Sequence, residues 1–313
     1  MSNVTEFVYY SVPLRIIKPV VFGILSILVI GGNTLCLVVL KRHHNNFKTT
    51  TRLFLTSLTC ADLLTGLLYI FPLFIVSLLD DAIPWSVTRN ICFATRVTFM
   101  LSSIISIMSL LCVNIDRYIA IEYPLRCEII FTARRARIAI ACIWTLSLMA
   151  TVAGYFALLK KSDYDSELCN AFYDLDTNTI ETLVMSVLAG AMMPIAITIV
   201  IYARIIVIVN RHKKMENKFG VGRLPASSPR NRFADSKALN TFLLVTAISC
   251  STWIPVCVFT IYNYINHGVF TNSIIDLLVL TIALCTFWIN ILIYTCRDRS
   301  FRKGALELLR PTR

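Results

Sequence analysis

The sequence predicts an all-α membrane protein, a seven-transmembrane helix bundle with its N-terminus outside. Three observations predict this fold class: a composition too apolar for water, apolar blocks of membrane-spanning length, and an uneven distribution of Lys and Arg. Of the 313 residues, 57% are hydrophobic and 15% are charged, whereas a soluble domain carries about a quarter charged residues. The solvent around most of this chain is therefore lipid.

Seven apolar blocks follow one another, each long enough to cross roughly 30 Å of hydrocarbon as a helix. They lie at about 17–40, 52–79, 89–121, 137–158, 180–209, 238–265 and 271–295. The blocks lack the alternation of membrane β-strands. The first is longer than a cleavable signal core, so we expect a retained span. Residues 1–16 are then an extracellular N-terminus, 17–295 the membrane domain, and 296–313 a cytoplasmic helix and short tail.

The net charge of +12 is distributed in a way that sets the orientation. With the N-terminus outside, 24 of the 30 Lys and Arg residues fall in segments that face the cytoplasm. This positive-inside pattern predicts that the N-terminus is outside and the C-terminus inside. It explains the basic charge without any nucleic-acid surface.

Two cytoplasmic segments differ from the other, short connections. The third cytoplasmic loop, at about 210–237, combines basic residues with Gly, Pro and Ser, a composition typical of a mobile loop. After the seventh span, the segment from Asp298 to Leu309 has the pattern of a short amphipathic helix. Such a helix is expected to lie on the inner membrane surface, in contact with lipid.

Cysteine positions follow the same topology. Nine of the eleven cysteines lie in spans or at the cytoplasmic face, where thiols stay reduced, and two of these, Cys127 and Cys296, are candidate acylation sites. Only Cys92 and Cys169 lie at the outer face, so they are the natural disulfide pair. Asn3 begins an Asn-Val-Thr glycosylation sequon on the outer terminus.

Polar groups inside the spans are candidate functional residues, because each costs several kcal/mol unless it is satisfied. Asp62 in the second span, Ser106 in the third and Asn290 in the seventh lie at similar depth. They can line one hydrated cavity in which the carboxylate holds a small cation such as sodium. An internal hydrogen-bond network around a protonated or solvated Asp62 is the alternative.

Asp116, Arg117 and Tyr118 close the third span at the cytoplasmic surface. Arg117 follows Cys92 by 25 residues, roughly 37 Å of helix at about 1.5 Å per residue, so the two lie at opposite faces. Arg117 is either an ordinary basic residue at the inner face or part of a switchable ion pair. The adjacent Asp116 and the facing Asp235 favour the ion pair.

From about Gly31 to Leu309 the chain resembles the rhodopsin-like, class A G-protein-coupled receptors. One signature after another matches in order and at the family's spacing. These are Gly32-Asn33, Leu58 with Ala61-Asp62, Cys92, Asp116-Arg117-Tyr118, Trp144, Pro194 with Tyr202, Asp235-Ser236-Lys237-Ala238-Leu239, Trp253-Ile254-Pro255, and Asn290 with Tyr294.

The resemblance implies a role for several of these positions. A Cys92–Cys169 disulfide would hold the second outer loop over a ligand pocket in the bundle. Trp253, above the Pro255 kink, would move when an extracellular ligand binds. Arg117 would then leave Asp235 and contact a heterotrimeric G protein as the sixth span swings outward. A ligand would favour this state by binding it more tightly than the other state.

Three residues depart from the family pattern. Ile291 follows Asn290 where the family carries proline, Ser249 stands where a phenylalanine packs below Trp253, and Thr252 replaces a cysteine. We expect a straighter seventh helix, a looser packing switch and altered basal activity.

The pocket positions that the resemblance implies are mostly apolar, with a few hydroxyls. Phe99 stands where amine receptors carry an aspartate, and Leu284 where opsins carry the retinal-linking lysine, so neither subclass is favoured. A small molecule or a peptide remains as the ligand. The implied lining consists of Phe99, Met100, Ser103, Ser186, Cys257, Thr260 and Leu280.

Arg96 is the one basic residue near the expected pocket mouth. It either binds an anionic group of a ligand or pairs with an outer acid such as Asp163, Asp165 or Glu167. The outer acids could instead attract a basic peptide, although a solvated loop is the commoner meaning of such a cluster.

A transporter or channel is the competing function, and it predicts charged or broken-helix sites at midplane in related halves. Only Asp62 fits that pattern, and the sequence shows no internal repeat. An enzyme is not expected, because no metal-ligand spacing, phosphate-binding glycine loop or nucleophile–base signature is present. We therefore expect a multi-pass receptor of the plasma membrane, without a cofactor other than a sodium ion.

Overall fold

The computed structural model describes residues 12–43, 47–79, 82–159, 190, 192–219, 229–265, 273–297 and 299–309. The helices in this part of the chain are α1 (Val12–Arg42), α2 (Thr49–Thr65), the π-helix η2 (Gly66–Ile70), α3 (Phe71–Leu79), α4 (Trp85–Glu122), α5 (Cys127–Ile130), α6 (Ala133–Leu159), α8 (Met193–Phe219), α9 (Pro229–Ile265), α10 (Ser273–Arg297) and α11 (Arg299–Leu309). Seven stretches of the described chain are long and apolar enough to cross a membrane. The predicted seven-helix bundle is therefore confirmed.

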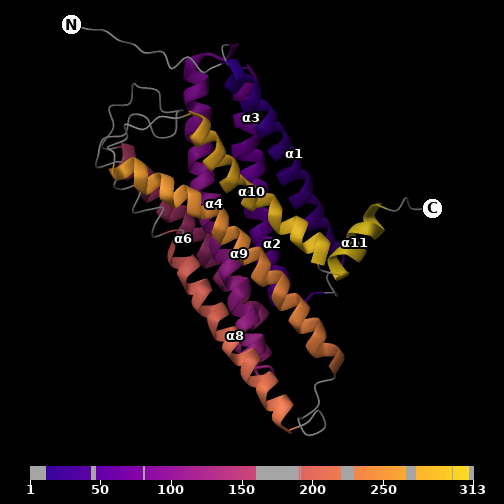
Figure 1. Ribbon diagram of the computed structural model, residues 1–313. Coiled ribbons are helices and arrows are strands. Elements are labelled where there is room, and N and C mark those ends of the chain that lie inside the picture. Colours follow the sequence, from indigo (N-terminus) through magenta and orange to yellow (C-terminus); the bar gives the residue numbers. More distant parts are fainter. Residues whose placement is uncertain are drawn as a thin grey trace.

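The spanning helices run roughly along one axis, and the short α11 turns away at their cytoplasmic end (Figure 1). The first span is α1, and the stretch α2–η2–α3 forms the second. The third to seventh spans are α4, α6, α8, α9 and α10, in that order. α4 packs against α2, α6 and α8, and α9 packs chiefly against α10. α4 is thus the central helix against which the others are positioned.

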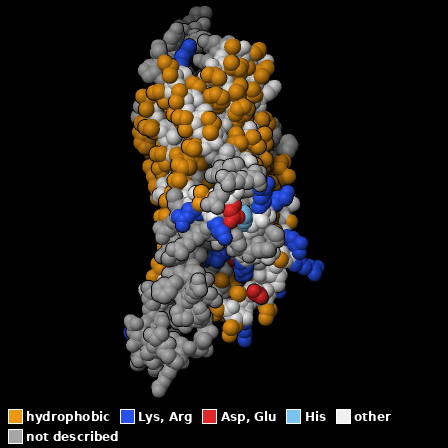
Figure 2. All heavy atoms as spheres, turned by 90° about the vertical axis from the view of Figure 1, so that its right-hand side faces the viewer, with side chains coloured by type: hydrophobic (Ala, Val, Ile, Leu, Met, Phe, Trp, Pro, Cys, Tyr) orange, Lys and Arg blue, Asp and Glu red, His pale blue; other side chains and the backbone are white. Residues whose placement is uncertain are grey.

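Exposed apolar side chains cover the outside of the bundle, as lipid contact requires. Ile27 is 75% exposed and Leu146 is 62% exposed. Figure 2 shows an apolar surface over the upper part of one face, with Lys and Arg gathered below it. This separation follows the predicted positive-inside orientation.

The π-turn in the second span brings α1 unusually close. A Cβ at Gly66 would lie 2.8 Å from a side-chain carbon of Ile30 and 3.0 Å from one of Val29. Glycine is therefore required at this crossing, since real side chains do not approach so closely. A single widened turn of this kind, a π-bulge, changes the direction of the rest of the helix.

Buried polar side chains tie neighbouring helices together. The Asn33 amide of α1 donates to the backbone oxygen of Phe287 in α10 at 2.9 Å. The Trp144 indole N–H of α6 donates to the Ser57 hydroxyl at 3.0 Å, and Ser57 lies 3.0 Å from the Ser109 hydroxyl of α4. These bonds link five helices at positions where the hydrocarbon offers no other partner.

The predicted amphipathic helix after the seventh span is present as α11. Phe301 and Ala305 are buried against the bundle, and the Phe301 ring lies 6.2 Å from the ring of Tyr294. Leu306 is exposed on the opposite side. Tyr294, a predicted switch residue, therefore joins the end of α10 to α11.

Candidate functional site

Three predicted residues meet in the middle of the bundle. The Ser106 hydroxyl of α4 donates to Asp62 Oδ1 at 2.7 Å, and the Asn290 amide of α10 donates to Asp62 Oδ2 at 3.2 Å. Asp62 itself is fully buried. Both carboxyl oxygens are thus hydrogen-bonded to other helices, as a buried carboxylate requires.

Next to this cluster, a second pair of hydroxyls joins α2 to α4. Thr65 donates to the Ser102 hydroxyl at 2.7 Å, and Ser102 donates to its own helix at Thr98. The Asp62 cluster is therefore flanked by further oxygen atoms. Oxygen donors of this kind suit a hard cation.

At the cytoplasmic end of α4, Asp116 is fully buried and is bound by the start of the second span. The hydroxyl of Thr50 donates to Asp116 Oδ1 at 2.8 Å, and the hydroxyl of Thr51 donates to Oδ2 at 2.7 Å. Lys48 Nζ lies 3.2 Å from Oδ1. Lys48 therefore neutralises the carboxylate, and the two hydroxyls of the same segment orient it.

Arg117 follows Asp116 and is half-buried at the same end of the bundle. Its guanidinium lies 3.9 Å from Asp116 Oδ2 and donates to the Thr51 hydroxyl. This ion pair is longer than the one that Asp116 forms with Lys48. The predicted partner Asp235 lies in α9, but its side chain is outside the described residues.

A buried amide connects α4 with α8 and α9 slightly deeper in the bundle. The Tyr202 hydroxyl of α8 donates to Asn114 Oδ1 at 2.9 Å, and the Thr246 hydroxyl of α9 donates to the same oxygen at 3.2 Å. Asn114 is fully buried. Tyr202, one of the predicted switch residues, thus touches both the third and the sixth span.

Near the outer half of the bundle, Trp253 of α9 belongs to an aromatic cluster centred on Phe99. The Phe99 ring lies 4.6 Å from that of Tyr69, 6.2 Å from that of Phe287 and 6.3 Å from that of Trp253. Separations of this size are typical of interacting aromatic pairs. Phe99 therefore connects the second, sixth and seventh spans directly.

Pro255 lies inside α9, two residues after Trp253. Thr252, the residue before Trp253, forms a hydrogen bond through its hydroxyl with the Thr286 hydroxyl of α10. Proline removes a backbone hydrogen bond and favours a bend. The sixth span therefore has a weakened turn at Pro255, close to a direct hydrogen bond with the seventh span.

The other pocket positions are mostly buried in the outer half. Ser103, Cys257 and Thr260 are buried, and Cys257 Sγ lies 3.5 Å from the Met192 sulfur. Met100 and Leu280 are half-buried, and Leu280 packs against the same apolar cluster as Phe99.

Other predicted residues lie at or beyond the edge of what the structure describes. Arg96 is half-buried and interacts electrostatically with Tyr69. Cys92 is disulfide-bonded. Cys169, Ser186, Asn3 and the outer acids at 163, 165 and 167 lie outside the described residues.

Sequence reasoning missed the segment that binds Asp116. It paired this acid with its neighbour Arg117, whereas Lys48, Thr50 and Thr51 supply the closest contacts. A signal was available, because a lysine followed by three threonines begins a span at the depth where α4 ends with an acid. Asn114 was also missed, although an amide inside a span predicts a hydrogen bond to another helix.

Comparison with known proteins gives a consistent match over most of the chain. The family model described as 7 transmembrane receptor (rhodopsin family) matches residues 32–294. The alpha-1A adrenergic receptor of Cavia porcellus is 24% identical, over 96% of this chain and 69% of that protein. Galanin receptor type 1 is 26% identical in Rattus norvegicus and 27% in Homo sapiens, over 93% of this chain and 81% of each relative. None of the three is a transporter or an enzyme.

The contacts of Asp116 predict that Thr50→Val destabilises the protein. Valine has nearly the same shape but removes a hydrogen bond to a buried charge, a loss of roughly 1.5–3 kcal/mol. We expect a lower midpoint in thermal unfolding of the purified protein in nanodiscs. Thr145→Val is the matched control, since Thr145 is exposed and its hydroxyl donates to backbone oxygens of its own helix, those of Ala141 and Cys142. Equal midpoints for the two variants would contradict this assignment.

Proposed function

The chain belongs to the rhodopsin family of seven-transmembrane receptors, and we propose that a ligand bound near Phe99 drives α9 outward to activate a heterotrimeric G protein. Membership of this family makes the chain a multi-pass membrane protein and a G-protein-coupled receptor for an extracellular ligand. We place it in the plasma membrane, where such a ligand has access to it. The remaining question is how its own residues carry the signal.

The pocket lining supports a ligand whose buried part is uncharged and largely apolar. Phe99 offers no counter-ion to an amine, and its ring is surrounded by Tyr69, Phe287 and Trp253. An anionic group placed among these rings would lose its hydration without gaining a partner, and an amine would gain only contacts with ring faces. An anionic group at the pocket mouth, bound by Arg96, is compatible with this apolar part.

Phe99 supports a direct route from the pocket to the sixth span. Because its ring stacks against Trp253, a ligand that displaces Phe99 also changes the packing of Trp253. Interiors are close-packed, so such a displacement moves neighbours rather than being absorbed. The bend at Pro255 then allows the cytoplasmic part of α9 to swing.

The observation that carries this proposal is the arrangement around Asp116. Lys48, Thr50 and Thr51 together bind the acid, so its charge is neutralised without a close Arg117 pair. Arg117 is thereby held in place beside Thr51 at the cytoplasmic end of α4. In this proposal it provides the contact that a G protein uses once α9 has moved.

A ligand screen in cells, with a readout for each G-protein class, tests the function. We expect compounds that activate the wild-type chain to lose their response in Arg117→Ala, because the G-protein contact is removed while the pocket is retained. Surface expression of both forms is measured in the same cells.

Arg302→Ala is the matched control, since it removes an exposed positive charge from α11 on the same cytoplasmic side. It should keep the response. Ligand-dependent signalling that persists in Arg117→Ala would overturn the proposed role of Arg117.

We also propose that Asp62 and Ser106 hold a sodium ion. Their oxygen atoms lie together at 2.7 Å in the centre of the bundle, and an all-oxygen donor set fits a hard cation. A bound cation would neutralise Asp62, a charge that is costly in hydrocarbon. The cation would therefore stabilise the arrangement in which α2, α4 and α10 are joined.

This proposal predicts that sodium raises the thermal-unfolding midpoint of the purified receptor above its value in potassium at equal ionic strength. A cation that binds only the folded state stabilises it by about 1.4 kcal/mol at roughly ten times its dissociation constant. Asp62→Asn should abolish the difference between the two salts. A midpoint that is equal in sodium and potassium for the wild type would contradict the sodium site.

A further inference from the structure

Asn114 is the point at which three spans are held together by one side chain. It is fully buried in α4, where an amide is costly unless it is hydrogen-bonded. Its Oδ1 accepts from the Tyr202 hydroxyl of α8 at 2.9 Å and from the Thr246 hydroxyl of α9 at 3.2 Å. A single oxygen of α4 therefore binds both the fifth and the sixth span.

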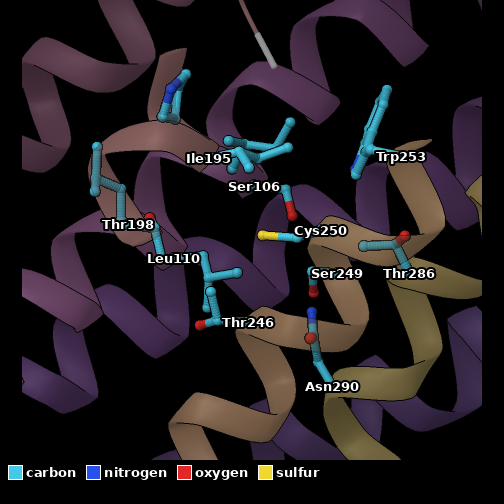
Figure 3. Close-up of a pocket in the computed structure, with 13 residues that line it drawn as sticks. Ser106, Leu110, Ile195, Thr198, Thr246, Ser249, Cys250, Trp253, Thr286 and Asn290 are labelled. Atoms are coloured by element: carbon cyan, nitrogen blue, oxygen red, sulfur yellow. The ribbon is translucent and has the colours of Figure 1, made fainter. Parts of the chain in front are cut away.

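The contact between Thr246 and Asn114 matters because apolar packing between α9 and α4 is interrupted beside it. α9 packs chiefly against α10, and a cavity of about 30 Å³ lies between α4, α8, α9 and α10 on the cytoplasmic side of Trp253. Thr246 and Thr286 line it on opposite sides in Figure 3. Atoms that face each other across a cavity do not touch and gain no dispersion attraction. The hydrogen bond of Thr246 therefore supplies a large share of the attachment of α9 to α4.

A second polar contact holds α9 further along the helix, next to Trp253. The Thr252 hydroxyl is hydrogen-bonded to the Thr286 hydroxyl of α10. Thr252 follows Thr246 by six residues, about 9 Å of helix at 1.5 Å per residue. The two contacts attach α9 to different helices, the first to α10 and the second to α4. If the cytoplasmic half of α9 rotates outward about the contact with α10, the contact with α4 must break.

The Thr246 hydroxyl has another acceptor within reach when it leaves Asn114. Threonine inside a helix can donate to the backbone oxygen four residues earlier, as Thr260 of the same helix does to Val256 at 2.7 Å. Thr246 can therefore replace one hydrogen bond by another when α9 moves. The contact with Asn114 favours the inward position of α9, and its loss leaves the outward position accessible.

We propose that Asn114 is a positioning residue that keeps α9 and Tyr202 of α8 in the inward position, with the contact between Thr252 and Thr286 as the pivot. This inference rests on the proposed function, in which α9 swings outward, and it identifies the contact that opposes the movement. Because both hydroxyls share one acceptor, the loss of Asn114 would release the fifth and sixth spans together.

Fluorine-19 NMR of the purified, ligand-free receptor in nanodiscs tests this role without a G protein. Trifluoromethyl-phenylalanine introduced at position 238 of α9 reports the inward and outward positions as separate resonances. We expect Thr246→Val to raise the ratio of outward to inward signal roughly threefold or more, because a hydrogen bond that favours the inward position is lost. Thr246→Ser retains the hydroxyl and should keep the ratio close to that of the wild type. Thermal unfolding verifies that each variant is folded.

Thr151→Val is the matched control, because Thr151 is also buried but its hydroxyl donates to the backbone oxygen of Ser147 in its own helix. It should leave the ratio unchanged. The effect of Thr246→Val should also disappear in Asn114→Leu, whose apolar side chain is of similar size, since the interaction between the two residues is then already lost. A ratio that Thr246→Val leaves unchanged, or raises equally in the Asn114→Leu background, would overturn the proposal.

Nucleotide exchange by a purified heterotrimeric G protein, measured with the same variants, separates this proposal from the signalling proposal. An outward population that rises together with the exchange rate supports both. An outward population that rises without faster exchange supports the role of Asn114 and contradicts the signalling role of α9.

Discussion

The buried acid and amide side chains that this chain carries into the hydrocarbon bond to other helices, and these contacts determine how the bundle is arranged. Lipid offers no hydrogen bonds, so an unpaired group costs several kcal/mol. Asp62, Asn33 and Asn114 each bond across helices at or below 3.2 Å. Association of apolar helices alone would leave their rotation and depth loosely defined. The polar contacts specify both, and the signalling residues are the same groups.

Much of the fold could be predicted because its causes act locally on the sequence. Span length follows from hydrocarbon thickness, and orientation follows from Lys and Arg counts. The Asp62–Ser106–Asn290 cluster could also be predicted, since depth along a helix follows from residue number. The contacts of Asp116 with Lys48 and Thr50 could not, because they depend on how α2 is rotated about its axis relative to α4. No local pattern gives that rotation.

The unusual residues of the sixth and seventh spans have packing consequences. Ile291, which takes the place of a proline, packs against α1, where a Cβ at Gly32 would lie 2.9 Å from its side chain. α10 runs as one helix from Ser273 to Arg297. Ser249 has the opposite effect, because its small side chain lines a cavity below Trp253. One substitution thus tightens the contact with the first span, and the other opens the interior beside the sixth.

The central claim is that α9 moves relative to the helices joined at Asp116. Spin labels introduced through non-natural amino acids at positions 134 in α6 and 238 in α9 would report this movement by pulsed electron resonance. A shift to longer distances is expected when a nucleotide-free G protein binds the wild-type receptor, and no shift in Arg117→Ala, because outward helix motion is coupled to that contact. Unchanged distances in a wild-type complex whose G-protein binding is verified independently would contradict the account.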